Sequence, residues 1–414
     1  MPDIKKFDHY LEHDGPVALV IRENLMPVEG TDGVLFPATY AGGDNFPGGY
    51  NIDGDLNGTN VCLIDSVGSQ ANRIEPIFAE EKYKELVPQV VVKISDEKSV
   101  SIFEASHRAG DALVRCSSLQ QPLQDAFKKV LAGTAEPLAR LAPTSLVFGV
   151  WDSRDTQAKL PRLVASTIRA YNVRKLTRSA QFNPSAEYVN DKLLDEPADK
   201  AAKDAYAERG FIHVPASGSH GGVIATGGIR REATLGLAAL RLLAVKGDAE
   251  ATRKLRRYIL GLSLVAYTHN PSGYLRQGCL LVKDPKKAAE NEFVEVLPTG
   301  ERKPCSITAD EALAYAISAA KEFGVATVEP VPFDKDRAKR DVTGQGAGGT
   351  ITGIIKAIGA NNKNFTINKN KYKLNDNTKF IKDGAESTLA VVLIQGSSVE
   401  VESADGAALS VTAK

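Results

Sequence analysis

The sequence lacks the features that would assign the chain to a membrane, to a secreted disulfide scaffold or to a polycation. Its formal net charge is zero, from 51 basic and 51 acidic side chains, which argues against a histone-like protein. The four cysteines show no CxxC spacing, a pattern that favours free thiols and predicts a cytoplasmic location. No apolar run reaches the ~18 residues of a membrane span, and the polar residues 1–10 predict no signal peptide.

Motifs that mark common catalytic sites are also missing. The chain has no Walker A loop, no GxSxG elbow and no HExxH pair, and its six histidines do not recur at metal-ligand spacing. We therefore expect no catalytic residue, no metal and no cofactor. Two alternatives stay open: His107 or His220 as a general base, since the unperturbed pKa of histidine is ~6.5, and Asp65, Asp152 or Asp155 as ligands of a nuclease metal.

What is present is a pattern of alternating strands and helices, which predicts an α+β fold. An apolar content of 43% in 414 residues is enough for a large core. We expect strands at 16–28, 60–66, 88–94, 145–153, 278–283 and 292–297. We expect helices at 66–86, 102–117, 160–171, 229–245, 249–267 and 308–323.

Two segments are predicted to be insertions into a first domain that spans residues 1–340. Residues 30–59 are rich in Gly, Asp, Asn and Pro, which predicts a long excursion or hairpin. Loops of this length are usually functional or disordered. Residues 184–228 combine a charged, Ala-rich insertion with a Gly-rich loop. The excursion carries the aromatic side chains Phe36, Tyr40, Phe46 and Tyr50.

The composition changes again near residue 341. Residues 341–349 contain the run VTGQGAGG and are predicted to be a flexible linker. In residues 350–414, short strands alternate with the turn signals NDN, KDG and ADG, which predicts a small all-β, OB-like barrel. Such a barrel can have several roles, and its lysines indicate contact with nucleic acid as one of them. These lysines are Lys363, Lys369, Lys371, Lys373 and Lys379.

Basic side chains gather between residues 140 and 178, where eight Lys or Arg face two Asp. Arg162 and Arg169 are seven residues apart, so the expected helix places them on one face. Arginine is well suited to bidentate contact with phosphate, and the cluster therefore indicates nucleic-acid binding. A solvated helix face is the alternative. The candidate contacts are Arg154, Lys159, Arg162, Arg169, Arg174 and Arg178.

A second candidate is the Gly-rich turn TGGIRR, which leads into an expected helix. Free backbone N–H groups and the helix dipole attract phosphate at such a place, beside Arg230 and Arg231. The turn lacks GxGxxG, which argues against a dinucleotide-binding fold, and a tight turn with two solvated arginines is the alternative. Arg73, Arg108 and Arg115 form a looser set that nearby carboxylates can neutralise.

Five runs of sequence carry a family resemblance. They are VCLIDSVGSQANRIEP (61–76), LVPQVVVKI (86–94), HRAGDALVR (107–115), LAPTSLVFGVWDSRDTQAKLPRLVASTIRAYNVRKLTRSAQF (141–182) and HVPASGSHGGVIATGGIRREATLGLAALRLL (213–243). Together they resemble the RAMP-superfamily backbone subunit, the CRISPR RNA-binding subunit, of type I-U (also called I-G) Cascade complexes. The resemblance spans roughly residues 15–335, and the C-terminal stretch departs from it.

The resemblance implies an RRM-like ferredoxin-fold palm with inserted finger and thumb elements. It implies a non-catalytic antiviral subunit that polymerises along CRISPR guide RNA, with copies of itself in a helical filament. Further partners are the target DNA strand, other Cascade subunits and a recruited helicase–nuclease. A RAMP endoribonuclease that processes precursor CRISPR RNA, or a metal-dependent backbone nuclease, is the alternative.

The resemblance also suggests which residues touch the guide. Residues 30–59 are the candidate thumb or finger, whose aromatic rings wedge between bases or stack on them. An ordinary surface loop is the alternative. Carried over as RNA contacts are Arg73, Arg108, Arg115, Arg154, Arg162, Arg169, Arg230 and Arg231.

Overall fold

The computed structural model describes residues 3–55, 58–269, 273–343, 349–367, 370–404 and 407–413. Helix and strand each take up about 31% of it, which confirms the α+β class. Among the described helices, none is long and apolar enough to cross a membrane. The chain divides into two compact units, which contain Met1–Val90, Phe103–Ala109 and Gln124–Val328, and Val91–Ile102, Gly110–Leu123 and Glu329–Lys414.

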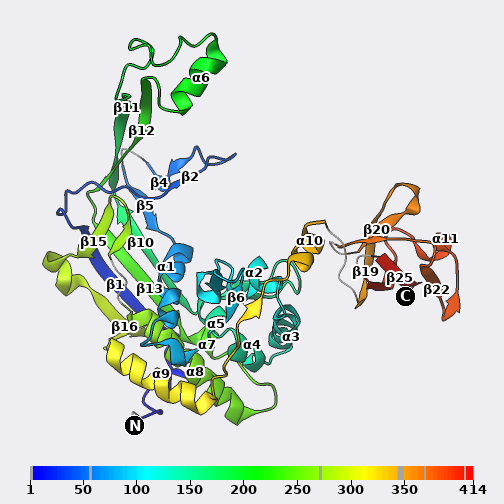
Figure 1. Cartoon of the computed structure of the whole chain (residues 1–414). Helices are drawn as coiled ribbons and strands as arrows, with labels where there is room; N and C mark the ends of the chain where they lie inside the picture. The colour runs from blue at the N-terminus through cyan, green and yellow to red at the C-terminus, as the bar shows by residue number, and fades with distance from the viewer. Residues whose placement is uncertain are drawn as a thin grey trace. The chain divides into compact units, whose positions relative to one another are not determined.

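One sheet organises the first unit (Figure 1). Its nine described strands are β1 (Ala18–Pro27), β4 (Ile52–Gly54), β5 (Asn60–Asp65), β10 (Val164–Tyr171), β13 (Ile229–Gly236), β14 (Tyr274–Arg276), β15 (Cys279–Lys283), β16 (Glu292–Val296) and β17 (Arg302–Pro304). Their order is β14-β15-β1-β13-β10-β5-β4, with β16 beside β1 and β17 beside β16. All the pairings among them are antiparallel.

The two faces of this sheet differ because its central strands alternate in burial. Successive side chains of a strand point to opposite faces. On β10, Val164, Ser166, Ile168 and Ala170 are buried, and residues 165, 169 and 171 are half-buried. β13 follows the same period from Ile229 to Leu235. One face therefore meets the core, and the other stays open.

Helix α1 (Val67–Ile74) packs on the buried face. Its N-cap, Ser66, accepts a hydrogen bond from the Ser69 N–H, which satisfies one of the unpaired donors of the first turn. Its Gln70 accepts a hydrogen bond of 2.9 Å from the hydroxyl of Ser166 on β10. Both side chains are buried, so this bond fixes the helix against the sheet.

Helix α8 (Ala249–Thr268) packs against β13 and β10. The hydroxyl of Tyr267 donates to the Ala233 carbonyl at 3.3 Å. Helix α9 (Ala309–Phe323) lies along α8, where Gly261 leaves room for the Ala316 backbone: a Cβ on the glycine would lie 2.9 Å from it. These two helices agree with the helices expected at 249–267 and 308–323.

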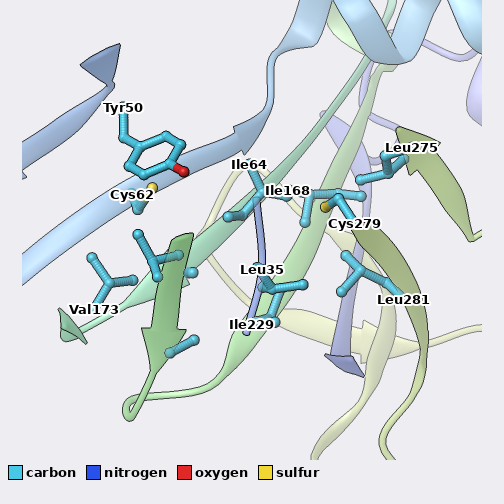
Figure 2. Close-up of a cluster of buried hydrophobic side chains, with 13 residues drawn as sticks. Leu35, Tyr50, Cys62, Ile64, Ile168, Val173, Ile229, Leu275, Cys279 and Leu281 are labelled. Carbon is cyan, nitrogen blue, oxygen red and sulfur yellow. The ribbon is translucent and has the colours of Figure 1, made fainter. Parts of the chain in front are cut away.

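A hydrophobic cluster fills another part of the buried face (Figure 2). It joins Cys62 and Ile64 of β5 and Ile168 of β10 to Leu281 of β15. Leu35, from the excursion at residues 30–59, is buried in the same cluster. The excursion is therefore anchored to the core at its base.

The excursion folds back as a small hairpin of β2 (Thr39–Tyr40) and β3 (Gly49–Tyr50). Its residues 56 and 57 lie outside the described residues. Where it meets β12 (Val214–Ala225), Gly222 has φ +95, and a Cβ there would lie 2.5 Å from Val34. A glycine is required at this crossing because both the φ value and the space exclude a side chain.

The second insertion is a two-stranded ribbon of β11 (Val173–Phe182) and β12, which extends from the sheet and carries α6 (Lys200–Glu208) (Figure 1). No side chain of α6 is buried, as expected of a surface insertion. The Gly-rich segment expected as a loop at 215–228 is instead largely a strand. Two irregularities in the register interrupt the pairing.

Two expected helices are wrong. Residues 164–171 form β10, so no helix face joins Arg162 and Arg169. Residues 229–236 form β13, followed by the short helix α7 (Leu237–Leu240), so the turn before Arg230 feeds a strand. In both segments every second side chain is buried, a period of two that only a strand satisfies.

Three further expectations are wrong in part. Residues 145–153 form α5 (Thr144–Phe148) and β8 (Val150–Trp151) instead of one strand. The helix expected at 102–117 is interrupted at Arg108, whose φ is +51, and α2 is limited to Ala112–Arg115. The helix expected at 66–86 ends at Ile74. The remaining helices of this region are α3 (Gln120–Leu131) and α4 (Glu136–Leu141).

The second unit contains a small sheet of β6 (Val91–Lys93), β7 (Ser99–Ser101) and β18 (Val331–Pro332), together with α10 (Lys335–Thr343). The predicted linker, residues 341–349, begins inside α10. Its residues 344–348 lie outside the described residues.

A separate sheet forms the C-terminal part. Its strands are β19 (Gly349–Ile358), β20 (Asn364–Ile367), β21 (Asn370–Lys373), β22 (Lys379–Lys382), β23 (Ala385–Glu386), β24 (Ser398–Ala404) and β25 (Ala407–Ala413). Their order is β21-β20-β19-β24-β25-β22-β23, and a parallel pairing of β21 with β25 closes the sheet on itself. Within residues 350–414, which were expected to form short strands and turns, Leu389–Val392 forms the short helix α11.

Candidate nucleic-acid interface

The open face of the central sheet carries a grid of polar side chains from three strands. Arg22 on β1 lies opposite Glu232 on β13, and Glu232 lies opposite Thr167 on β10. Two residues further along each strand, and so on the same face, Arg230 lies opposite Arg169. Because directly opposite residues share a face and lie ~4.5–5.5 Å apart at Cβ, the strand register alone brings these groups together.

Glu232 is the centre of this grid. Its Oε1 lies 3.5 Å from Arg22 Nε, and its Oε2 lies 3.4 Å from Arg169 Nη1. The Tyr171 hydroxyl donates to the same Oε2 at 3.3 Å. Arg22 and Arg169 are each 39% exposed and Glu232 29%, so solvent and ligands reach the whole group.

Arg230 stacks on an aromatic ring of the same face. Its guanidinium carbon lies 4.1 Å from the centre of the Tyr171 ring. Such a contact holds the guanidinium plane in place and leaves its N–H edges available. Its Nε is buried and has no hydrogen-bond partner among the described residues. The contact thus holds the Arg230 guanidinium beside the Tyr171 ring on the open face.

A hollow of about 420 Å³ lies on this face. This volume falls in the range of small-molecule sites, ~300–1,000 Å³. Arg302 of β17 also lines it, and its guanidinium is paired with Glu292 at 2.6 Å. The polar lining consists of Arg22, Thr167, Arg169, Glu232, Thr234 and Arg302. Cations and hydroxyls outnumber the carboxylate, which suits a ligand of phosphate and sugar.

Two of the arginines carried over from the sequence are buried in ion pairs. Arg108 is 4% exposed, and its Nε donates to Glu75 at 2.5 Å. Arg231 is 5% exposed, and its Nη1 donates to Glu23 at 2.6 Å. A buried charge has to be paired, because desolvating it alone costs several kcal/mol. In this structure neither guanidinium is presented to a ligand, and their assignment as phosphate contacts is corrected.

Arg73 and Arg115 are also held by carboxylates. Arg73 Nε donates to Asp65 at 3.1 Å, and its Nη2 donates to the Leu275 carbonyl at 2.6 Å. Arg115 Nε donates to Asp341 at 2.9 Å within the second unit. The bond from Arg73 to Leu275 and the pair of Arg115 with Asp341 join segments far apart in the chain, so both arginines contribute to folding.

The remaining basic candidates are exposed but lie on different elements. Arg154 and Lys159 lie on the hairpin of β8 and β9 (Lys159–Leu160), where Lys159 Nζ is 5.5 Å from the centre of the Trp151 ring. Arg162 follows them. Arg174 and Arg178 lie on the β11–β12 ribbon. The single helical stripe expected from the sequence is therefore divided among a hairpin, the open face and the ribbon.

Arg162 illustrates how packing constrains an exposed cation. Its Nε donates to the Phe148 carbonyl at 3.1 Å, which fixes the base of the guanidinium. Partial burial and then the nearby Arg108 lower its pKa. Its Cγ also lies close to Gly149, which has φ +76 and leaves no room for a Cβ.

The aromatic candidates of the excursion also differ in exposure. Tyr50 is 6% exposed, its ring lies 4.9 Å from that of His220, and its hydroxyl accepts from the Gly222 N–H at 3.0 Å. It belongs to the core, which corrects its assignment as a base wedge. Phe36 and Phe46 are half-buried, and Tyr40 is 38% exposed.

The groups proposed for the enzymatic alternatives have structural partners. Asp65 is buried and accepts from Gln70 at 2.6 Å in addition to Arg73. Asp152 is buried and accepts from the hydroxyl of Thr156 at 2.6 Å. His220 packs on Tyr50. His107 is exposed.

Sequence reasoning missed six residues of the open face: Arg22, Thr167, Tyr171, Glu232, Thr234 and Arg302. The sequence carries no clear signal at Arg22, because residues 18–21 are all apolar and residues 22–24 are all polar. The helices expected over 160–171 and 229–245 left out the alternating burial that the structure gives β10 and β13.

Comparison with known proteins finds that part of the chain is similar to a known family. Residues 19–175 match the family model described as CRISPR-associated protein GSU0053 (Cas_GSU0053). The matched segment includes four strands of the central sheet, β1 from its second residue, β4, β5 and β10. No curated protein matches the chain. The match supports a CRISPR-associated protein of the RAMP type, and the subtype rests on the sequence resemblance alone.

Proposed function

We propose that this chain, similar over residues 19–175 to a CRISPR-associated protein, is a non-catalytic subunit that binds the phosphate–ribose backbone of CRISPR guide RNA. The observation that carries the proposal is the open face, where Arg22, Arg169 and the stacked Arg230 border the hollow. A guide-binding subunit has to accept any base sequence, so it contacts phosphate and ribose instead of base edges.

The connectivity of the sheet supports an RRM-like palm. β16, β1, β13 and β10 are adjacent in this order and antiparallel. α1 lies in the connection between β1 and β10, and α8 lies in the connection between β13 and β16. This is the arrangement of a split βαβ–βαβ unit. RRM domains bind single-stranded RNA on the open face of such a sheet, the face where Arg169 and Arg230 lie here.

The two insertions supply the proposed finger and thumb. The β2–β3 hairpin carries the exposed Tyr40, and the β11–β12 ribbon carries Arg174 and Arg178. A subunit that repeats one such contact with the next copy forms an open helical filament. In this proposal copies of the chain coat the guide in the cytoplasm and present it to a target DNA strand, beside other Cascade subunits and a recruited helicase–nuclease.

The C-terminal sheet is proposed to be an OB-like barrel that adds a second contact with nucleic acid. Its closed cycle β19-β20-β21-β25-β24 encloses a core around Phe365 and Val401. OB-folds bind oligonucleotides on such barrels. Four of its five candidate lysines are exposed, namely Lys363, Lys371, Lys373 and Lys379. Lys369 lies outside the described residues.

Co-purification tests the proposal. The chain is co-expressed with a CRISPR array and its neighbouring Cascade genes, and the particle is separated by size-exclusion chromatography. We expect a multi-subunit particle whose ratio of absorbance at 260 to 280 nm shows nucleic acid, and whose extracted RNA maps to spacers. A particle with the absorbance ratio of pure protein would overturn the proposal.

The same preparation tests the enzymatic alternatives. Labelled repeat RNA and labelled target RNA are incubated with the protein, in EDTA and in Mg²⁺. We expect both RNAs to stay intact. Cleavage in EDTA that a His220→Ala or His107→Ala variant abolishes would identify an endoribonuclease, and cleavage that requires Mg²⁺ would identify a metal-dependent nuclease.

A further inference from the structure

We infer that Glu232 recognises ribose: its carboxylate accepts a hydrogen bond from the 2′-hydroxyl of a bound nucleotide, and the open face thereby selects RNA over DNA. The inference rests on the proposed function, because it specifies how the surface that binds the guide backbone distinguishes ribose from deoxyribose. The 2′-hydroxyl is the group that allows a protein to make this distinction.

The first observation is the place of the carboxylate. Of the ten side chains that line the hollow, all within the described residues, Glu232 is the single acidic one. A carboxylate repels the phosphates that Arg22 and Arg169 attract, so at this position it weakens binding to any nucleic acid backbone. If Glu232 accepts a hydrogen bond from the ligand, its position between the two arginines is explained.

The second observation is how loosely Glu232 is held. Its three contacts measure 3.3, 3.4 and 3.5 Å. On the buried face of the same strands, Arg231 and Glu23 meet at 2.6 Å. An ionised carboxylate offers about four acceptor positions, and contacts of more than ~3.2 Å use them poorly. Glu232 therefore keeps the capacity to accept a short bond from a ligand hydroxyl.

The third observation is the spacing of the grid. Arg22 and Thr167 flank Glu232 on the two neighbouring strands, and Arg169 lies on its diagonal. Neighbouring strands are ~4.7–4.9 Å apart, a distance comparable to the width of a ribose ring. A phosphate held by Arg22 or Arg169 therefore places its own sugar over Glu232.

A purely positioning role for Glu232, in which it only orients Arg22 and Arg169, makes a different prediction. Those arginines bind the phosphates of RNA and DNA alike. Disturbing them changes the affinities for both polymers by the same factor. The ratio of the two affinities therefore separates recognition of ribose from support of the arginines.

The test uses two substitutions. Glu232→Gln removes the charge and keeps a carbonyl acceptor, whereas Glu232→Met removes both charge and acceptor at similar length. Wild type and both variants are titrated, by fluorescence anisotropy at one salt concentration, with oligonucleotides of one sequence made as RNA, 2′-fluoro RNA and DNA. The fluorinated strand keeps an RNA-like sugar and lacks the hydroxyl donor.

We expect the wild-type protein to prefer RNA over both other strands. Glu232→Met should lower the RNA-to-DNA affinity ratio by about tenfold or more, the loss of a hydrogen bond to a charged group. Glu232→Gln should keep most of the ratio. A Met variant with the wild-type ratio overturns the inference, as does a wild-type protein that binds the three strands equally. A wild-type protein that binds none of them overturns the proposed function as well.

Discussion

Replacing Arg169 and Arg230 with alanine should make RNA binding less sensitive to salt while leaving the fold intact. Both guanidiniums lie on the open face, where Arg169 is 39% exposed and Arg230 stacks on Tyr171. Neither forms a buried ion pair of the kind that joins Arg231 to Glu23. Their removal therefore takes phosphate contacts away without leaving a carboxylate buried and unpaired.

The size of the effect follows from counterion release. Each phosphate neutralised on a single strand contributes about −0.7 to the slope of log affinity against log salt. Losing two contacts flattens that slope by about 1.4. Between about 50 and about 200 mM salt, a fourfold increase, the wild-type protein should thus lose roughly seven times more affinity than the double variant. At low salt the variant should bind more weakly to every sequence.

The assay is a salt series of anisotropy titrations on an unstructured RNA of fixed length. Arg253→Ala is the matched control, because this arginine is exposed on α8, which packs on the buried side of the sheet. Unfolding in urea shows that each variant is folded. The assignment of the open face as the phosphate site is refuted if the double variant keeps the wild-type slope, or if the control flattens it equally.

Gly222→Ala should destabilise the first unit by about 1–3 kcal/mol more than Gly133→Ala does, as measured by urea titration. Both glycines have positive φ (+95 and +93), but only at Gly222 do other atoms lie within 4 Å of the added Cβ. Equal losses of stability for the two variants would contradict the close packing at Gly222. Burial raises the pKa of Glu75 to about 7 from 4.5, against the lowering effect of Arg108, so the folded state keeps a proton that the unfolded state releases. Stability should therefore fall as pH rises from about 4.5 to about 7, and Glu75→Gln should lose this part of the pH dependence; an unchanged profile would place the titration elsewhere. Thr308→Ala removes the capping box of α9 and should lower the free energy of unfolding by about 1 kcal/mol. Thr308→Ser keeps the hydroxyl and should unfold with a free energy near that of the wild type.

Elements whose ends carry a chemical signal were predictable from the sequence. α8 begins at the N-cap Asp248, and α9 begins with the reciprocal bonds of Thr308 and Glu311. β5 is a run of apolar residues with a turn on either side. In these segments the residues next to an end stabilise it directly, and no distant partner is needed.

β10 and β13 were not predictable in the same way. Helical spacing is found for Leu160, Leu163, Val164, Ile168 and Tyr171, yet in the structure every second side chain of β10 is buried. Which period is used depends on whether strands are available on both sides to accept the backbone hydrogen bonds. β10 has β5 and β13 as neighbours, and β13 has β1 and β10. Such pairing joins residues far apart in the chain, so local propensity does not decide it.

The candidate site shows the same division. The sequence alone determined that the chain has no net charge, that arginines cluster between residues 140 and 178, and that its longest family resemblance covers that cluster. These are properties of composition and spacing, which need no fold to be counted.

Only the tertiary structure decided which arginines can meet a ligand. Arg108 finds Glu75 across 33 residues, and Arg231 finds Glu23 across 208, so both are neutralised inside the protein. Arg169 and Arg230, which the sequence does not distinguish from them, lie on the open face. The physical reason is that an arginine's availability depends on the carboxylate that folding places beside it, and that carboxylate comes from a distant part of the chain.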